Sequence, residues 1–357
     1  MARAELVVDR LVATGFIRPS VLWRGLQRCR PSFSHWGVGL LIGLSGLLVE
    51  PLAWLQSLLY AQRLRRVQLP DDPIVIIGHW RSGTTFLHQL LACDPVVATA
   101  RNTLTMAPQV ALLLQPWIAP LMKVWMTRVR PIDAVPWGPD DPQEDELGLA
   151  RLTFDTNMGG MAFPRDYLAN FRRHVLETST AYERQWLTFC RLTWLHDGAG
   201  KSHWLIKNSV HTARVRLVLK HFPRARFVLL RRSPVDSIRS LVQVKQRLGA
   251  LVGLQPLPDP PTQVEETATA HRELLEAFEA SRHLIPAQQL LELDYDDLIS
   301  QPLQAVEGIY THFDLTSWPV AEAPIKARID RARSYTADPV QLPPLAERRL
   351  QELMKAS

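Results

Sequence analysis

The segment from Gly78 to Thr85, GHWRSGTT, has the composition of a loop that binds phosphate. It follows a β-branched run, Ile74 to Ile77, and precedes a stretch with helical periodicity, so we expect it to connect a buried parallel strand with a helix. In that position backbone N–H groups converge and the helix dipole favours an anion. The residues expected to contact the anion lie in the loop and the first helical turn: Arg81, Ser82, Gly83, Thr84 and Thr85.

The loop lacks the lysine that kinases use. It nearly matches the pattern GxxxxGK[ST], but Thr84 stands at the lysine position and the cation, Arg81, precedes the glycine. A kinase or an NTPase needs a cation on the β- and γ-phosphates and a hydroxyl on magnesium. Because the loop departs from this pattern, a P-loop nucleotide kinase is the second enzymatic hypothesis and not the first. ATP turnover with magnesium would support it.

Five segments together resemble the sulfotransferases that use 3′-phosphoadenosine-5′-phosphosulfate (PAPS), most closely the broad bacterial group that also resembles the Golgi-type enzymes. They occur in the expected order over roughly residues 72–315, which separates the resemblance from a chance match to one motif. The segments are GHWRSGTT at 78–85, DDPQEDE at 140–146, LIKNSVHT at 205–212, RSPVDSIRS at 232–240 and DYDDLISQP at 294–302. The resemblance implies transfer of a sulfuryl group from PAPS to a hydroxyl or amine acceptor, without a metal.

The resemblance also implies where the donor binds. Its 5′-phosphosulfate is expected in the GHWRSGTT loop, and its 3′-phosphate between Arg232 and Ser240. The expected positions of these two residues agree with a shared phosphate site. Arg232 follows the end of a strand, and Ser240 lies about two turns into the next helix, on a facing side. Ser233 replaces the usual acid after the arginine and can cap that helix equally well. Phe86 stands where many members carry an aromatic that packs on adenine, although packing in the core explains it equally.

Sulfuryl transfer, like phosphoryl transfer, needs in-line geometry and charge stabilisation. We expect Arg81 to stabilise the leaving phosphate and Lys207, at a strand end facing the same cleft, to contact the sulfuryl oxygens. An alcohol acceptor must also lose its proton to a base. In the cytosolic branch of the family a histidine lies two positions after the lysine, but Ser209 stands there. Glu144, in an acidic stretch that would ordinarily be solvated, is our first candidate for the base and His211 the second. Glu146 in the same stretch and His79 in the loop are further candidates.

The elements that must position these residues alternate between strands and helices. Further strands are expected at 204–206, 227–230 and 290–293, and further helices at 210–222, from Pro234 onward and around 306–313. This alternation predicts an α/β fold with a P-loop-like parallel sheet flanked by helices. We expect residues 71–357 to form this domain and residues 1–70 to form an N-terminal helical extension.

The extension is apolar and basic. Its uncharged run, Trp36 to Val49, ends at Glu50 and Pro51, and five arginines from Arg10 to Arg30 precede it. A spanning helix needs about 20 uninterrupted apolar residues, so this run falls short. We expect a helical hairpin packed on the main domain. Peripheral membrane contact through the flanking arginines is the alternative.

The composition of the chain limits which classes of binding partner and which cellular compartment we expect. The net charge of +6 favours acidic ligands, but the chain has no long Lys/Arg run and no known nucleic-acid module, so nucleic acid is not expected as a partner. Cys29, Cys93 and Cys190 are far apart and form no CxxC pair. They indicate neither a metal site nor a disulfide framework, and they favour a reducing, cytoplasmic compartment.

The sequence leaves the acceptor open between a small molecule, a lipid and a glycan. Met106, Trp117 and Met122 suggest an apolar pocket wall, although ordinary helix packing explains them equally. A non-catalytic, membrane-associated scaffold with the same fold is the third functional class. PAPS binding without transfer to any acceptor would indicate it.

Overall fold

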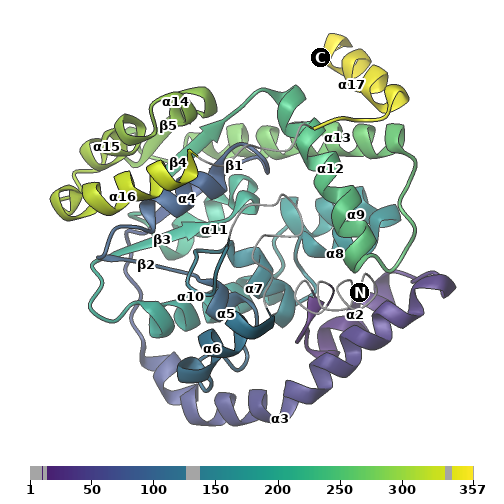
Figure 1. The fold of residues 1–357 in the computed structure, drawn as a ribbon, viewed down its shortest axis with the longest axis horizontal. Helices are drawn as coiled ribbons and strands as arrows, with labels where there is room; N and C mark the ends of the chain where they lie inside the picture. The colour runs from purple at the N-terminus through teal and green to yellow at the C-terminus, as the bar shows by residue number, and fades with distance from the viewer. Residues whose placement is uncertain (1–9, 11–13, 126–136, 334–339, 357) are drawn as a thin grey trace.

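The computed structural model describes residues 10, 14–125, 137–333 and 340–356. A five-stranded sheet runs through it in the order β2, β3, β1, β4, β5, with helices on both faces (Figure 1). The strands are β1 Ile74–Gly78, β2 Val97–Thr99, β3 His203–Lys207, β4 Arg226–Arg231 and β5 Leu290–Asp294. All four strand pairings are parallel, so the expected α/β fold with a parallel sheet is confirmed.

The helices of the described residues vary from single turns to more than eight turns. In chain order they are α2 Pro19–Arg28, α3 Trp36–Arg66, α4 Thr84–Leu91, α5 Asn102–Thr105, α6 Gln115–Trp125, α7 Asp145–Leu152, α8 Met158–Ala162, α9 Tyr167–Phe171, α10 Thr180–Asp197, α11 Val215–His221, α12 Pro234–Val252, α13 Pro260–Arg282, α14 Tyr295–Ser300, α15 Pro302–His312, α16 Trp318–Ala332 and α17 Pro344–Ala356. Short 3₁₀ turns occupy Phe33–His35, Pro164–Asp166, Ser209–Ala213 and Ala287–Gln289, and Arg172–Leu176 is a π-helical turn.

Two elements differ from the sequence-based expectation. The strand β2 was not predicted, because three residues are too few to show a periodic pattern. The single helix expected at 210–222 is a 3₁₀ turn followed by α11, with a break at Arg214. The Arg214 side chain is buried and donates hydrogen bonds to the backbone carbonyls of His174 and Val175, which ties this break to the π-helical turn.

Both faces of the sheet are buried, because alternate residues of each central strand enter different hydrophobic clusters. On one face Val75, Ile77 and Phe227 pack against the aromatic side chains of α10 and α13, among them Trp186 and Phe278. On the other face α4, α15 and α16 cover the residues between them in sequence, which are Ile74, Ile76, Val228 and Leu230. The faces of the central strands are therefore apolar.

The loop between β1 and α4 depends on two glycines. The backbone φ angles are +134° at Gly78, +69° at Arg81 and +93° at Gly83, in the left-handed region that favours glycine. A Cβ atom at Gly78 would lie 2.5 Å from the Leu230 carbonyl oxygen, and one at Gly83 would lie 2.7 Å from the Tyr295 ring. The loop therefore packs directly against the end of β4 and the start of α14.

The long helix of the N-terminal extension is α3. The helix α3 continues for 31 residues through Glu50 and Pro51, so it extends beyond the uncharged run from Trp36 to Val49. A proline removes one intrahelical hydrogen bond, and here the helix accommodates that loss. Within the segment Phe33–Arg66 an 18-residue stretch has a mean hydropathy of 1.8, and the helix is long and apolar enough to cross a membrane by length and composition.

One side of α3 nevertheless packs on the rest of the protein. Gln56 is buried and its side-chain amide donates to the Pro108 carbonyl at 2.9 Å, while its oxygen accepts from the Leu112 amide at 2.8 Å. Farther along the same side, Ile42 packs with α2 and with Phe163 in one buried cluster. The helices α2 and α3 thus form a hairpin docked on the domain. The division of the chain at residue 70 stays a prediction.

Replacing Gln56 with alanine is expected to lower the free energy of unfolding by about 2 kcal/mol, because it leaves buried backbone groups of residues 108–113 without partners. Denaturant unfolding measures the change. The matched control is Gln62→Ala on the exposed side of the same helix, which should change stability little. Equal effects of the two substitutions would show that α3 is not anchored through Gln56.

Candidate active site

The candidate site lies where β1, β3 and β4 end side by side. In these strands Gly78 is paired with Leu230, and Ile76 is paired with Lys207, so the loops that follow the strands leave one edge of the sheet. Open α/β sheets bind ligands beyond the carboxyl ends of their strands. The sequence-predicted residues of the site come from these loops and from the helices that follow them.

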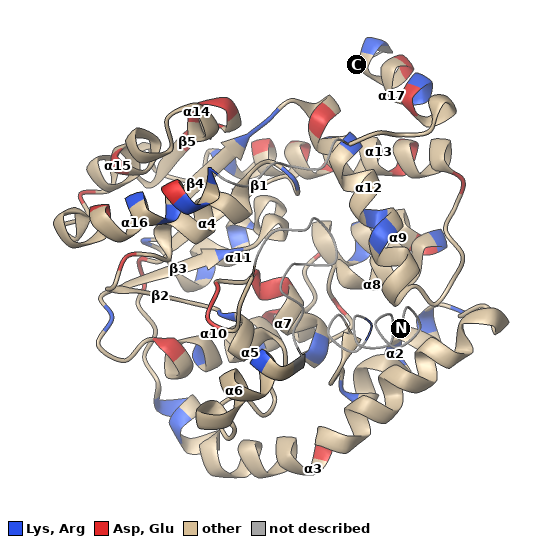
Figure 2. Cartoon of the chain, in the orientation of Figure 1, with Lys and Arg blue, Asp and Glu red and all other residues tan. Residues whose placement is uncertain are grey.

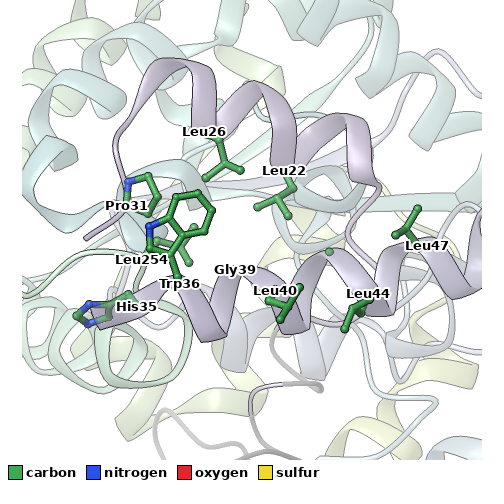
Figure 3. Close-up of a pocket in the computed structure, with 11 residues that line it drawn as sticks. Leu22, Leu26, Pro31, His35, Trp36, Gly39, Leu40, Leu44, Leu47 and Leu254 are labelled. Carbon is green, nitrogen blue, oxygen red and sulfur yellow. The ribbon is translucent and has the colours of Figure 1, made fainter. Parts of the chain in front are cut away.

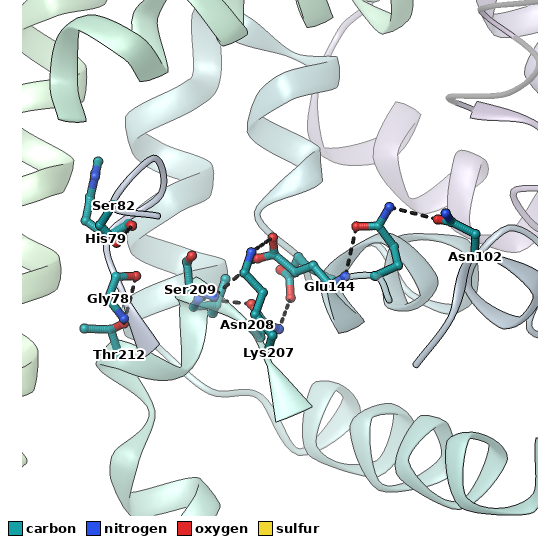
Figure 4. Close-up of polar contacts among 12 residues, drawn as sticks. Gly78, His79, Ser82, Asn102, Glu144, Lys207, Asn208, Ser209 and Thr212 are labelled. Atoms are coloured by element: carbon teal, nitrogen blue, oxygen red, sulfur yellow. Dashed lines mark hydrogen bonds and ion pairs between the residues drawn. The ribbon is translucent and has the colours of Figure 1, made fainter. Parts of the chain in front are cut away.

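The phosphate loop is fixed by hydrogen bonds from its own residues and from the segment after β3. Ser82 is buried, and its hydroxyl donates to the His79 carbonyl at 2.7 Å (Figure 4). The Thr212 hydroxyl accepts from the Gly78 amide at 2.8 Å and donates to the Gly78 carbonyl at 3.2 Å. Thr84 is buried at the start of α4 and Thr85 is partly exposed beside it. A loop fixed in this way is ready to bind an anion without rearranging.

Three of the predicted donor-binding side chains meet next to this loop. Arg81 donates a hydrogen bond from Nε to the Ser240 hydroxyl at 2.9 Å, across 159 residues of sequence. Arg232 donates from Nη1 to the Arg81 backbone carbonyl at 2.8 Å. Two guanidinium groups and a hydroxyl therefore lie at the end of β4 and at the start of α12. They form a site suited to a ligand with more than one phosphate.

Tyr295 was not singled out from the sequence, although it lies within the DYDDLISQP segment. The Arg232 guanidinium lies over its ring at 4.1 Å from the centroid. The same ring is the surface that a side chain at Gly83 would strike. Tyr295 therefore holds Arg232 in place and limits the loop to glycine, which is a positioning role that only the folded chain reveals.

Phe86 is half-buried and packs against the hydrophobic cluster beneath α4. Part of its ring thus belongs to the core, as the simpler interpretation of the sequence expected. Its contact with an adenine ring stays a prediction.

A buried ion pair lies beside the phosphate loop. Lys207 is 4% exposed, and its Nζ lies 2.5 Å from Oε2 of Glu144 (Figure 4). The other carboxylate oxygen accepts from the Ser209 amide at 3.3 Å. On the far side, the side chain of Gln143 accepts from the Glu144 amide and donates to Asn102 at 3.0 Å. The first candidate base therefore contacts the lysine expected to bind the transferred group.

The neighbours of Glu144 are buried, although such an acidic stretch would ordinarily be solvated. The Glu146 carboxylate accepts from the Asn208 side chain at 3.0 Å and from the Asn157 amide at 2.7 Å. Burial raises the pKa of Glu146, and burial together with the charge of Glu144 raises the pKa of Asp145 well above its usual value. The Glu146 carboxylate therefore holds the stretch in place, and Glu144 contacts Lys207.

His211 lies in the core. Its side chain is fully buried and its ring lies 5.0 Å from the ring of Trp186. Burial, together with the nearby charge of Arg214, lowers the pKa of His211 to about 3. It is a weak base in these surroundings, and the structure gives it no access to solvent.

Among the described residues no group of three or more histidine, cysteine, aspartate or glutamate side chains is arranged to hold a metal ion. The residues at the sheet edge do fit an anionic nucleotide. Two guanidinium groups, two buried hydroxyls and the backbone amides of the loop lie around Gly78 and Gly83. A side chain at either glycine would clash with its neighbours.

Comparison with known proteins agrees with this geometry. The chain is 25% identical over 311 residues to omega-hydroxy-beta-dihydromenaquinone-9 sulfotransferase Stf3 of Mycobacterium bovis and of Mycobacterium tuberculosis, covering 85% of this chain and 77% of each relative. Its fold is similar to crystal structures of two mycobacterial sulfotransferases. The TM-score is 0.66 at 17% identity for STF9 of Mycobacterium avium, with 94% of both chains covered. For STF1 of Mycobacterium tuberculosis H37Rv it is 0.62 at 19% identity, covering 89% of this chain and 86% of that one.

The model of the sulfotransferase family matches residues 73–319, which contain the phosphate loop, the Lys207–Glu144 pair and the Arg232–Ser240 motif. The resemblance seen in the sequence is thereby confirmed, and the protein is an enzyme that belongs to the sulfotransferase family.

Proposed function

We propose that the enzyme uses PAPS as its donor and sulfates a hydroxyl group of a lipid or another largely apolar acceptor. The observation that carries the proposal is the contact of Arg81 with Ser240 and Arg232, which joins the two phosphate motifs in one site. A donor with a 5′-phosphosulfate and a 3′-phosphate has anionic groups for both. PAPS supplies the sulfuryl group, and its phosphate oxygen is the leaving group.

Different residues of this chain bind different parts of the donor. The phosphate loop and the hydroxyls of Ser82, Thr84 and Thr85 hold the 5′ end of the donor, and Arg232 with Ser240 holds the 3′-phosphate. Arg81 stabilises the negative charge that grows on the leaving oxygen as the S–O bond breaks. The side chain of Phe86 packs on the adenine ring from the first turn of α4.

Lys207 and Glu144 act on the acceptor side. Lys207 neutralises the sulfuryl oxygens, and Glu144 takes the proton of the acceptor hydroxyl as the new S–O bond forms. Their ion pair orients both side chains before the substrates bind. We assign the base to Glu144 and not to His211, because His211 is buried and its pKa is lowered to about 3.

The nature of the acceptor and the compartment are also proposed. The related enzymes of Mycobacterium bovis and Mycobacterium tuberculosis are named for a hydroxylated dihydromenaquinone, which is a lipid. The Met106 and Met122 side chains belong to a small buried cluster with Ile118, so ordinary packing explains them, and they give no independent support for an apolar pocket. The three cysteines are free thiols, which suits the cytoplasm.

The assay that tests the function supplies labelled PAPS and screens hydroxylated lipids, amines, phenols, glycans and small natural products. Transfer is expected to a lipid hydroxyl and to remain unchanged after metal chelation. The product nucleotide 3′-phosphoadenosine-5′-phosphate should stabilise the protein by about 2.7 kcal/mol at 100 times its Kd, and ATP much less. Stabilisation by the nucleotide with no transfer to any acceptor would favour a non-catalytic scaffold. Turnover of ATP with magnesium would favour a kinase.

Alanine substitutions at the donor site are expected to distinguish residues that bind the donor from a residue that acts in the chemical step. Arg232→Ala and Ser240→Ala should raise the KM for PAPS with a small change in kcat, because they bind a phosphate that does not react. Arg81→Ala should lower kcat by roughly 10²-fold, by analogy with the loss of an oxyanion donor. Steady-state kinetics measure both parameters. Arg272→Ala, on the exposed side of α13, is the control and should change neither. If Arg81→Ala raised KM alone, the roles would be reversed.

Glu144→Gln is expected to lower kcat by roughly 10²- to 10⁴-fold, because the amide cannot accept the acceptor's proton. His211→Gln should retain kcat within a few-fold and act mainly on stability, since the side chain lies in the core. A normal kcat for Glu144→Gln combined with a large loss for His211→Gln would move the base to His211.

A further inference from the structure

The outward side of α3 is a continuous apolar surface. The residues of this helix that pack on the domain recur at helical spacing and include Val38, Ile42, Ala53 and Gln56. The opposite side carries large exposed side chains, which we call the apolar face: Trp36, Leu40, Leu44, Leu47, Leu48, Trp54, Leu55, Leu58 and Leu59. Leu48 is 79% exposed and Leu58 is 77% exposed. A helix of 31 residues is about 46 Å long, so this face extends along much of the molecule.

Neighbouring elements widen the apolar face. At its N-terminal end Phe33 is 93% exposed and Trp23 is 62% exposed. The helix α6 begins directly after Leu114, which packs with Ala53 of α3, and it carries exposed apolar side chains of its own: Trp117, Leu121 and Val124. Between α2 and α3 a groove of about 250 Å³ is lined largely by leucines, and Leu40 and Leu44 belong both to it and to the apolar face (Figure 3). A surface this large and this apolar indicates contact with another apolar body.

The charges near the apolar face are positive. Residues 10–67 contain eight arginines and one acid, Glu50, which forms an ion pair with Arg18. Figure 2 shows α3 without basic residues along its middle and with arginines at its C-terminal end. Arg63, Arg65 and Arg66 are exposed there, and Arg24 and Arg30 are exposed near the other end. Positive charge thus flanks the face at both ends.

These charges distinguish between the two bodies that could cover the face. If a second copy of the chain packed on α3, either relative direction of the two helices would bring arginines opposite arginines, which is repulsive. A bilayer that contains anionic lipids instead offers acyl chains to the leucines and phosphates to the arginines. We therefore propose that α3 docks the enzyme on an anionic membrane surface, with its axis in the plane of the membrane.

The buried side of α3 sets the depth of this docking. The hydrogen bonds of Gln56 to Pro108 and Leu112 and the ion pair of Glu50 with Arg18 hold the helix on the domain. Crossing the bilayer would break these contacts and place their polar groups in hydrocarbon. The helix therefore lies in the interface, with its apolar face among the outer parts of the acyl chains and its arginines at the lipid phosphates. This inference does not depend on the identity of the donor or the acceptor.

Flotation of the full-length protein with vesicles tests the proposal. One set contains phosphatidylcholine with about one third phosphatidylglycerol, and the other contains phosphatidylcholine alone; an anionic fraction is what the arginines require. The protein is expected to float with the anionic vesicles. The double variant Leu48→Glu/Leu58→Glu should bind them at least tenfold more weakly, since it adds charge to the buried part of the interface. The matched control, Ile299→Glu/Val320→Glu, alters two exposed apolar residues of α14 and α16 and should bind as the unaltered protein does.

The arginines give a second, independent readout. Arg65→Gln/Arg66→Gln should weaken binding to the anionic vesicles by about fivefold per arginine and leave binding to the neutral vesicles unchanged. The melting temperature of each variant shows whether it is folded. If Leu48→Glu/Leu58→Glu does not fold, Leu48→Ala/Leu58→Ala is used in its place. The proposal is overturned if the protein does not float, or if the folded leucine variant floats as well as the control. It is also overturned if sedimentation shows a dimer that Leu48→Glu/Leu58→Glu dissociates, because the face then contacts a second copy.

Discussion

The burial of both faces of the parallel sheet determines where chemistry can occur in this protein. Because helices cover each face, the side chains on the two faces of the central strands are apolar, and the charged side chains of the site lie where the strands end. The phosphate loop, Lys207 and Arg232 follow three neighbouring strands at one edge. The pairing register of the sheet, and not any single loop, therefore sets the distance between the residues proposed to bind the donor and those proposed to act on the acceptor.

Within this site the Lys207–Glu144 pair has an energetic cost that stability alone does not explain. Removing two charges from water costs several kcal/mol, and their attraction repays it only with good geometry and further hydrogen bonds. Here the backbone amide of Ser209 and the chain of Gln143 and Asn102 complete the network. A pair held in this way can exchange its partners for a substrate's charges without moving far, which is the preorganisation that a transfer reaction needs.

Much of this site could be predicted from the sequence because its residues follow strand ends within recognisable local patterns. The strand–loop–helix context of Gly83 and the cap at Ser233 are local, and the structure has both. Contacts between distant segments could not be predicted. Tyr295 meets Gly83 and Arg232 only in the folded chain, and the buried Glu146 carboxylate is bound by Asn157 and Asn208 from other segments. The passage of α3 through Pro51 was missed because local rules predict an end there, whereas packing on the domain maintains the helix.

The contact of Tyr295 with Gly83 and Arg232 has a consequence for the order in which the enzyme matures during synthesis. The loop and the arginine are made early and in mid-chain, but the ring that supports both comes from a segment near residue 295. The edge strand β5 and α14 must also emerge from the ribosome before that ring can reach its place. A nascent chain that ends before this point lacks the ring that supports the proposed nucleotide site, so this site can be completed only when most of the chain has been translated.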